Sequence, residues 1–251
     1  MSCELEANTR LIISTALDAG ASLAGIADLK LLEGLPVYGG LDLASYRCAV
    51  SVAVALPSGA LELISVKSPG VLYAHAYRTA NAALDAIALR VSQKISEKGH
   101  RAFVIPASLR IDIEKEIGHA SHKAFAWAAG LGWIGRNALL VNPIYGSDLR
   151  LATVVTDMPM ETATPVKNGC GECRLCVLSC PPKALSYAKF EVRPSSREEI
   201  LDTKRCAAWL NVKSDDLASD PLTAPLASHI CGMCIKVCPA GKRRKQPVTD
   251  H

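Results

Sequence analysis

The apolar positions at the start of the chain change from helical to strand-like spacing. From Leu5 to about Gly20 they recur at intervals typical of a helix, and the following SLAGIAD has the short apolar runs of a buried strand. The next apolar segment, CAVSVAVAL, is rich in β-branched residues and is bounded by Pro57, which predicts a central strand. We therefore expect the chain to open with one helix and two strands.

Helical and strand patterns continue to alternate beyond this point. The longest helical pattern covers residues 71 to 98 and ends at Gly99. After it, RAFVIPA predicts a strand, SHKAFAWAAGLG a helix, and ALLV and LRLATVVTD two further strands. Such alternation up to about residue 158 indicates an α/β sheet covered by helices. From MPMETATPVKNG onward the pattern stops, so we place a domain boundary near residues 158 to 168.

Cysteines dominate the last third of the chain, where eight of the ten form two related motifs. The run from Cys170 to Pro181 has the spacing C-x2-C-x2-C-x3-C-P, in which three cysteines bind one 4Fe-4S cluster and the fourth serves another. The run from Cys231 to Pro239 repeats C-x2-C-x3-C-P, and Cys206 is the candidate for its missing first ligand. This pattern predicts two iron–sulfur clusters.

Crossed ligation divides these eight cysteines into two complete sets. The first set is Cys170, Cys173, Cys176 and Cys238, and the second is Cys206, Cys231, Cys234 and Cys180. Two zinc sites are the alternative, because C-x2-C spacing also occurs in zinc proteins, but the two C-x3-C-P endings favour clusters. Outside the motifs, we expect Cys3 to be a loose terminal thiol and Cys48 a packed core residue.

Composition narrows the class of protein only a little further. The chain has 251 residues, of which 49% are hydrophobic and 21% charged, which excludes collagen-like, coiled-coil and disordered classes. A net charge of +4 does not by itself require a nucleic-acid or membrane partner. No uncharged run reaches the roughly 18 to 20 residues of a membrane-spanning helix. Together with the clustered cysteines, these features favour a soluble protein of the reducing cytoplasm.

Some weaker motifs have two possible interpretations. Residues 130 to 135 match G-x-G-x-x-G, but they close a helical pattern, so we prefer a helix-ending turn to dinucleotide binding. One helical face could hold both His119 and His122, for which capping or cofactor contact is favoured over metal binding. The helical neighbours Tyr73 and Tyr77 could point into a pocket or simply pack.

Two charged segments have ordinary surface interpretations as well. Asp112 follows the loop PASLRI and is a candidate proton donor, with an exposed loop carboxylate as the alternative. The basic residues 242 to 245 are more typical of a solvated terminus than of a nucleic-acid site. Neither segment determines the function.

The longest motifs resemble those of one known family. The stretch SHKAFAWAAGLGWIGRNALLVNPIYGSDLRLATVVTD, followed by CGECRLCVLSCPPKAL, LDTKRCAAWL and CGMCIKVCPAGK, resembles the epoxyqueuosine reductases and, more distantly, the reductive dehalogenases. The resemblance implies a nitroreductase-like α/β sandwich that holds cobalamin without its lower base ligand, followed by a small α+β ferredoxin-like double-cluster domain. We place these at residues 1–160 and 161–245, with 246–251 as a tail.

The resemblance also implies positions for the cobalamin. Residues that match the part of the family's α/β domain against the corrin ring are Leu139, Leu140, Asn142, Tyr145, Gly146 and Leu151. Ala208 matches a position near the corrin and the second cluster. Pocket reasoning adds the cofactor contacts Tyr73, Ser108 and His122, and the catalytic candidates Asp112 and Tyr77.

Two departures from the family pattern concern the substrate. The queuosine enzymes carry an Asp in a segment resembling F-V-D-S, proposed to protonate the substrate, whereas this chain reads Phe103-Val104-Ile105-Pro106. The chain also ends about a dozen residues after Cys238, where typical members continue into a helical repeat domain that helps hold tRNA. Both departures argue against a tRNA substrate.

The sequence therefore predicts a cobalamin-dependent iron–sulfur reductase. We expect low-potential electrons to pass from a ferredoxin- or flavodoxin-type donor through two 4Fe-4S clusters to cobalamin, and then to a small molecule or a corrinoid protein. One alternative is an electron-transfer protein that activates a corrinoid partner. Another is a reductase loaded with FMN, which related nitroreductase folds bind. Fold alone does not distinguish these functions.

Overall fold

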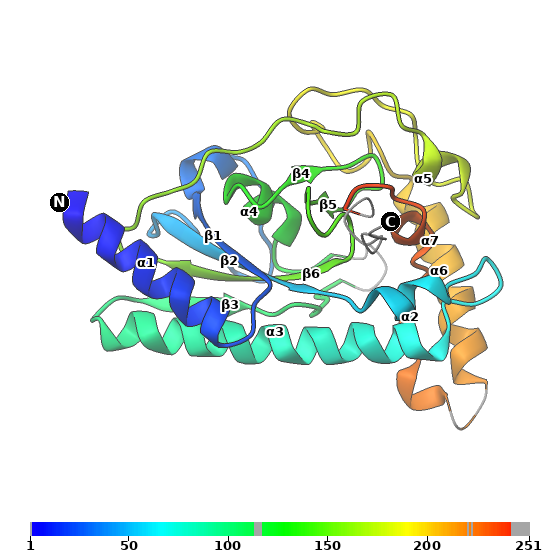
Figure 1. Ribbon diagram of the computed structural model, residues 1–251, viewed down its shortest axis with the longest axis horizontal. Helices are drawn as coiled ribbons and strands as arrows, with labels where there is room; N and C mark the ends of the chain where they lie inside the picture. The colour runs from blue at the N-terminus through cyan, green and yellow to red at the C-terminus, as the bar shows by residue number, and fades with distance from the viewer. Residues whose placement is uncertain (1, 113–116, 220, 222, 242–251) are drawn as a thin grey trace, which may run out of the picture. The chain divides into compact units, whose positions relative to one another are not determined.

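The computed structural model describes residues 2–112, 117–219, 221 and 223–241 (Figure 1). By its internal contacts the chain divides into two compact units, each made of segments that are not continuous in sequence. Unit 1 consists of Met1–Ala55, Thr79–Leu131 and Arg150–Val166. Unit 2 consists of Leu56–Arg78, Gly132–Leu149 and Lys167–His251.

These units bear on the predicted boundary near residues 158 to 168. The last segment of unit 1 ends at Val166, inside that range. Two earlier segments, residues 56–78 and 132–149, nevertheless group with the cysteine-rich part of the chain. The division into domains at residues 1–160 and 161–245 stays a prediction.

A four-stranded sheet in the order β1-β2-β6-β3 forms the centre of unit 1, apart from Leu149 at the start of β6. Its strands are β1 (Leu23–Asp28), β2 (Cys48–Ala55), β3 (Ala102–Ile105) and β6 (Leu149–Thr156). β1 pairs antiparallel with β2, and β3 pairs antiparallel with β6 so that Ile105 lies opposite Thr153. The strand predictions for these four segments are confirmed.

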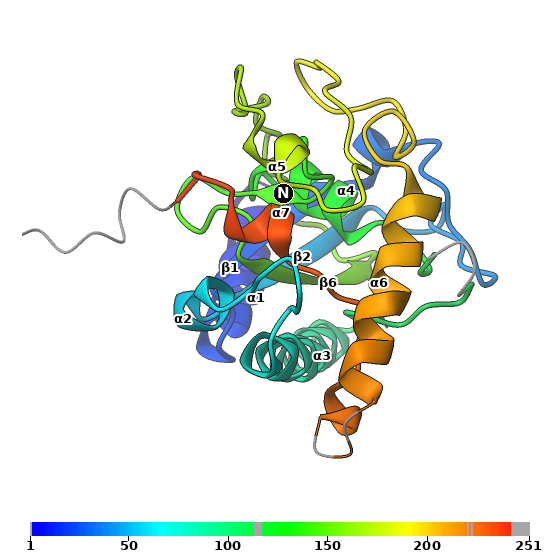
Figure 2. The same ribbon diagram turned by 90° about the vertical axis from the view of Figure 1, so that its right-hand side faces the viewer.

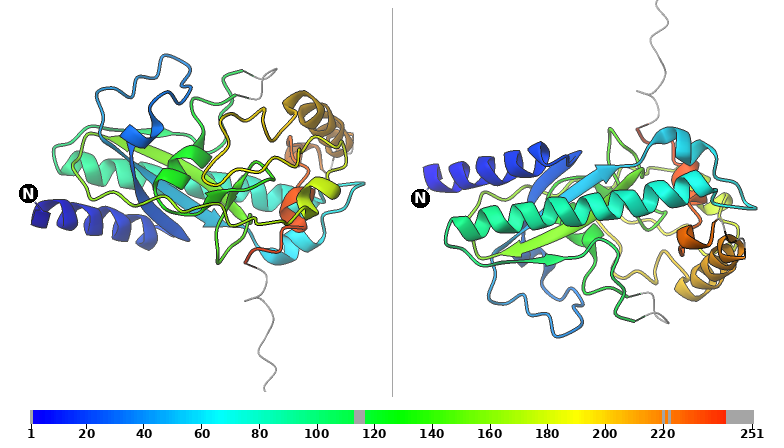
Figure 3. Two further views of the ribbon diagram at one scale, coloured as in Figure 1. Left: turned by 90° about the horizontal axis from the view of Figure 1, so that it is seen from above. Right: turned by 90° about the horizontal axis from the view of Figure 1, so that it is seen from below.

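Helices cover both faces of this sheet. α1 (Ser2–Asp18) and α3 (Val71–Glu97) lie against one face, and α4 (His122–Ala128) lies against the other (Figure 1). Seen from below, α3 lies across the strands (Figure 3). Because both faces are covered, the first six residues of β2 are all buried, which explains its continuous apolar sequence. The predicted α/β fold is therefore present.

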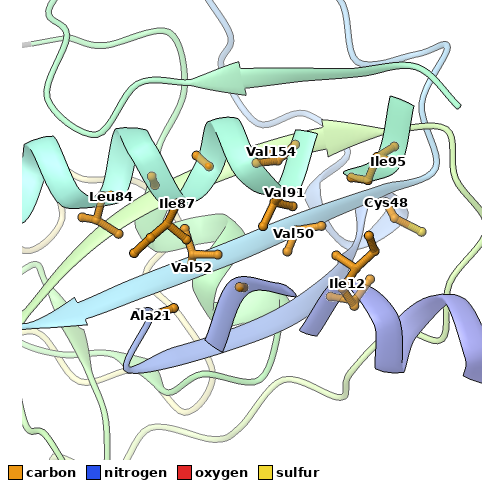
Figure 4. Packing of buried hydrophobic residues seen from close by; sticks show 14 of the residues in the cluster. Ile12, Ala21, Cys48, Val50, Val52, Leu84, Ile87, Val91, Ile95 and Val154 are labelled. Atoms are coloured by element: carbon orange, nitrogen blue, oxygen red, sulfur yellow. The ribbon is translucent and has the colours of Figure 1, made fainter. Parts of the chain in front are cut away.

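The core of unit 1 joins α1, α3 and the sheet. Val50 and Val52 of β2 lie against Leu84 and Val91 of α3, with Ile12 of α1 beside them (Figure 4). All five are at most 2% exposed in the folded chain. Burial of side chains of this size contributes about 1.5 to 3 kcal/mol each, so this cluster stabilises unit 1 substantially.

The predictions for Cys48 and for the glycine run after α4 are confirmed. Cys48 is 4% exposed and belongs to the core cluster. Cys3 is exposed as expected, but it lies within helix α1 and is not a loose terminal residue. The glycine run ends α4, since Gly130 has φ 68°, its N–H donates to the carbonyl of Trp127, and the N–H of Leu131 donates to that of Ala126. This is a Schellman ending, which favours glycine at the left-handed position.

Unit 2 contains short elements connected by long loops. Its only sheet among the described residues is the hairpin of β4 (Trp133–Ile134) and β5 (Leu140–Val141). Its helices are the first part of α3 (residues 71–78), α2 (Ser58–Glu62), α5 (Leu175–Leu178), α6 (Thr203–Ala218) and α7 (Met233–Lys236), of which α6 is prominent in Figure 2. Short 3-10 helices cover Leu29–Leu32 in unit 1 and Ala224–Leu226 in unit 2. None of the described helices is long and apolar enough to cross a bilayer.

Candidate iron–sulfur centre

The structure gathers the eight motif cysteines into two groups within unit 2. Burial raises the pKa of Cys176 to about 11, and the neighbouring thiolates that add to this rise are Cys170, Cys238 and Cys173. Burial also raises the pKa of Cys234 far above its usual range, and the thiolates that add to this rise include Cys231, Cys206 and Cys180. We call these the first and the second cysteine group.

Membership of the groups crosses between the two motifs. Cys238 belongs to the second motif but acts on Cys176 of the first group, and Cys180 belongs to the first motif but acts on both Cys231 and Cys234 of the second group. This is the arrangement that crossed ligation of two clusters requires. Cys176 also acts on Cys234, so the two groups are neighbours inside unit 2.

Zinc ions are the alternative to clusters at these two groups. Among the described residues, no three His, Cys, Asp or Glu side chains converge closely enough to hold one metal ion. A zinc site needs four ligands at about 2 Å from one ion. In a 4Fe-4S cluster each thiolate binds a different iron, so the sulfur atoms lie farther apart. The crossed membership of the groups is what favours clusters over zinc.

Local backbone geometry explains why both motifs begin Cys-Gly. Gly171 has φ 49° and Gly232 has φ 78°, so the residue after the first cysteine is left-handed in each motif. Glycine adopts this conformation without strain, and the chain turns sharply enough to present the next thiol on the same side. In the first motif the N–H of Cys173 then donates to the carbonyl of Cys170 at 3.0 Å.

Hydrogen-bond donors point at the cysteine sulfurs. The indole Nε1 of Trp133 donates to Sγ of Cys170 at 3.4 Å, and the N–H of Ala184 donates to Sγ of Cys180 at 3.3 Å. Donors of this kind stabilise the negative charge of thiolate-bound clusters and adjust their potential. Trp133 supplies such a donor to the first group and Ala184 supplies one to the second, so the surroundings of both groups fit clusters.

A second tryptophan occupies the corresponding place in the second group. Burial raises the pKa of Cys231, and the nearby Trp209 indole opposes that rise. The Nε1 of Trp209 is buried and has no hydrogen bond of normal geometry to any described residue. A sulfur carrying cluster charge would supply the acceptor that this donor lacks. The second group therefore also fits a cluster.

A buried lysine adds positive charge beside the second group. Lys213 is 7% exposed, and its Nζ lies 4.9 Å from the ring centre of Trp209. Its Nζ donates to the carbonyl of Lys67 at 2.8 Å and to the Asp216 carboxylate at 2.6 Å. Asp216 already compensates the ammonium charge, but the positive charge of Lys213 still acts to lower the pKa of Cys231 and would act in the same way on cluster charge.

Arg136 and Asn137 connect the loop after β4 to both cysteine segments. Arg136 is 5% exposed and donates to the carbonyls of Ala188 and Cys173, each at 3.1 Å. Asn137 donates to Oγ of Ser147 at 2.7 Å and to the carbonyl of Cys234 at 3.4 Å. Sequence reasoning missed both residues, although a polar pair inside an apolar segment was a signal of buried hydrogen bonding.

The predicted corrin-binding segment of unit 2 is a rigid turn. Oδ1 of Asn142 accepts the N–H groups of Ile144 and Tyr145, at 2.7 and 3.0 Å, and the backbones of Asn142 and Gly146 exchange two hydrogen bonds of 2.8 Å. Leu140, Asn142 and Gly146 are buried, so they shape the turn. Leu139 and Tyr145 are half-buried, and Ile144 is 46% exposed. The turn therefore presents apolar side chains from a fixed backbone.

The remaining predicted cofactor and catalytic residues are distributed over both units. In unit 2, Tyr73 is buried with its ring 6.5 Å from that of half-buried Tyr77, and Ala208 is exposed on α6. In unit 1, Ser108 is exposed and Leu151 is buried in β6. Asp112, also in unit 1, is half-buried and forms an antiparallel backbone bridge with Ile117. Their roles stay predictions.

His122 serves as a structural link in unit 1. Its Nε2 lies 3.0 Å from the carbonyl of Pro106, and its Nδ1 lies 2.8 Å from Oγ1 of Thr153. Because a carbonyl only accepts, Nε2 carries the proton and Nδ1 accepts from the threonine hydroxyl. His119 does not share a helical face with His122, because α4 begins at His122 and His119 precedes its N-cap, Ser121.

His122 makes the stability of unit 1 depend on pH. Burial lowers its pKa from 6.5 to about 4. Between these two pKa values the unfolded chain binds a proton at His122 and the folded chain does not. The contribution of His122 to the free energy of unfolding is therefore fully present above about pH 6.5, and about 3 kcal/mol is lost as the pH falls towards 4. We expect His122→Ala to lose most of this pH dependence of the free energy of unfolding, measured by urea unfolding between pH 7.5 and 4.5.

The matched control for that experiment is His75→Ala, which alters an exposed histidine. It should keep the wild-type pH profile. If His122→Ala instead lowers stability equally at every pH, the imidazole is not the titrating group.

The cysteine-rich segment and the whole chain both have known relatives. Residues 169–241 match the model of a 4Fe-4S double cluster binding domain. An epoxyqueuosine reductase of Aliivibrio fischeri is 28% identical over 152 residues, which cover 60% of this chain and 35% of the relative. The chain spans about a third to about half of the length of such curated relatives.

Solved structures share the fold over nearly the whole chain. A reductive dehalogenase, studied for a mechanism of B12-dependent dehalogenation, has a TM-score of 0.71 and 19% identity, covering 95% of this chain and 32% of its own. The epoxyqueuosine reductase of Streptococcus thermophilus has a TM-score of 0.59 and 21% identity, covering 94% of this chain and 66% of its own. The chain is therefore similar in sequence to epoxyqueuosine reductases, contains a segment that matches a double-cluster domain, and shares its fold with epoxyqueuosine reductases and reductive dehalogenases.

Proposed function

We propose that the protein is an iron–sulfur reductase that holds two 4Fe-4S clusters and uses a cobalamin cofactor. The observation that carries the proposal is the sorting of eight cysteines into two crossed groups, inside the segment that matches a double-cluster domain. Bound clusters carry single electrons, and cobalamin supplies a strongly reducing cobalt centre. The relatives are named as reductases, which supports an enzyme.

Residues of this chain would prepare the clusters for electron transfer. The neighbouring positions of Cys176 and Cys234 allow a short path from one group to the other. Trp133 donates a hydrogen bond to a sulfur of the first group, and Lys213 places positive charge beside the second. Both features favour the more negatively charged, reduced state of the clusters. Unit 2 therefore has the charge distribution of an electron conduit.

Two observations support the proposal that the protein binds cobalamin. The first is the likeness to a fold in which B12-dependent dehalogenation is studied. The second is the rigid turn held by Asn142, where half-buried Leu139 and Tyr145 and exposed Ile144 offer apolar contact. A fixed apolar surface suits one face of a flat macrocycle. We propose that this turn contacts the corrin.

The absorption and resonance spectra of the anaerobically reconstituted protein test the proposal. We expect corrinoid bands after incubation with cobalamin, and a cobalt(II) paramagnetic resonance signal without nitrogen splitting from a lower ligand. This absence of splitting is expected because both ring nitrogens of His122 are already hydrogen-bonded. Clear nitrogen splitting would contradict the proposed mode of cobalamin binding, and no binding at micromolar cobalamin would rule out cobalamin as the cofactor.

The same spectra distinguish the two other functions. Clusters without any second cofactor would make the protein an electron-transfer partner or a reductive activator of a corrinoid protein. A flavin spectrum would make it an FMN-loaded reductase. Two zinc ions without sulfide would end the iron–sulfur interpretation altogether.

A further inference from the structure

The segment that carries the first cysteine motif also exposes two leucines. Leu175 is 46% exposed and Leu178 is 65% exposed, and both lie on the short helix α5. Residues three apart on a helix share a face, so these side chains form one apolar patch. Helix α5 also carries Cys176, a member of the first cysteine group, so the patch lies beside that group.

Basic side chains surround this patch. The Nζ of Lys183 donates to the carbonyl of Leu178 at 2.8 Å, which fixes an exposed ammonium group at the end of α5. At the other end, the guanidinium of Arg174 lies 4.1 Å from the ring centre of Tyr187. The hydroxyl of Tyr187 donates to Glu172 at 2.6 Å, so one acidic side chain of the segment is already engaged. We call the two leucines with Arg174 and Lys183 the α5 face.

The charge of this segment is unusual for the chain. Residues 167 to 193 contain five Lys or Arg and two Glu, a net charge of +3 in a chain whose total is +4. Glu172 is also neutralised by Lys189, whose Nζ lies 2.9 Å from its carboxylate. The surface beside the first cysteine group is therefore apolar at its centre and positive around it.

Building on the proposed function, we infer that the α5 face is the docking site of a small acidic electron-carrier protein. A positive rim attracts an acidic partner and speeds encounter, and a small apolar centre favours a contact that is specific but brief. The partner would then lie beside the first cluster, because α5 carries one of that cluster's cysteines, and electrons would enter there. Nucleic acid fits less well, since its backbone binds through phosphate contacts and offers nothing to two exposed leucines.

Stopped-flow reduction of the clusters tests this assignment, with reduced plant-type 2Fe-2S ferredoxin as the acidic probe. We expect Lys183→Glu and Leu178→Glu each to lower the second-order rate constant at least about tenfold at low salt, and we expect the wild-type rate to fall as salt rises. Reduction by dithionite, a small reagent that needs no docking face, should stay unchanged. Leu178→Ser replaces Leu178→Glu if the latter loses iron.

Matched controls place the same changes elsewhere on the protein. Lys98→Glu and Leu89→Glu alter exposed residues of unit 1 and should leave the ferredoxin rate at the wild-type value. If Lys183→Glu and Leu178→Glu also leave it unchanged, or if all four variants lower it equally, the inference is wrong. Loss of self-association or of tRNA binding in the α5 variants, with an unaltered ferredoxin rate, would assign the face to another occupant.

A binding measurement separates this inference from the proposed function. Calorimetric titration with oxidised ferredoxin detects docking even if the clusters accept no electrons. Iron content, measured first, reports on the clusters alone. Binding to wild type that is lost in Lys183→Glu supports the α5 face whatever the cofactor, and no binding to wild type at low salt overturns it.

Discussion

Cys180→Ser is expected to remove the second cluster and leave the first, although Cys180 stands in the first motif. The reason is that its thiol lies with Cys231 and Cys234, and a buried group left with three thiolates holds its cluster weakly. The anaerobically prepared variant should contain about four irons and four sulfides per chain instead of the about eight of wild type. Paramagnetic resonance of the reduced protein should then show one cluster signal.

The reciprocal variant makes the experiment decisive. Cys238→Ser should remove the first cluster, because Cys238 lies with Cys176 despite belonging to the second motif. Cys206→Ser should match Cys180→Ser. Cys3→Ser is the control, since this exposed cysteine lies outside both groups and its loss should leave the iron content unchanged. If Cys180→Ser and Cys176→Ser instead remove the same cluster, ligation follows the motifs and does not cross.

Local patterns were sufficient for most of unit 1. β2 and α3 could be predicted because a continuous β-branched run and a long 3.6-residue period are each properties of one segment. β4 escaped prediction because two residues, Trp133–Ile134, are too few to show any period. α6 was missed although Asp202 accepts the N–H of Arg205, a capping pattern that the sequence contains.

In the candidate site too, features set by local sequence could be predicted and features set by contacts between distant segments could not. Short-range spacing was enough to find the cysteines, because three thiolates within seven residues must converge. Spacing could not find Arg136, Trp209 or Lys213, whose relation to the cysteine loops depends on contacts between distant segments. Arg136 reaches the carbonyl of Cys173 from 37 residues away. Such polar groups become visible only once the fold places them.

The protein should not reduce epoxyqueuosine in tRNA at a useful rate, which we propose from the geometry of β3. The place where the family resemblance expects an aspartate holds Ile105, which is 3% exposed and pairs with Thr153 of β6. Its side chain has no proton to give, and general acid catalysis is typically worth about 10²- to 10⁴-fold. Asp112 is the nearest candidate in sequence, but its backbone is bound in a bridge with Ile117.

Reconstituted protein, reductant and epoxyqueuosine-containing tRNA test this directly, with nucleosides analysed by mass spectrometry. The epoxyqueuosine reductase of Aliivibrio fischeri serves as the positive control. We expect this chain to form queuosine at least about 100-fold more slowly than that enzyme, because the proton donor is missing. Any residual rate that disappears in Asp112→Asn would assign the proton to Asp112. Queuosine formation at the rate of the control would show that Ile105 is no obstacle and that tRNA is the substrate.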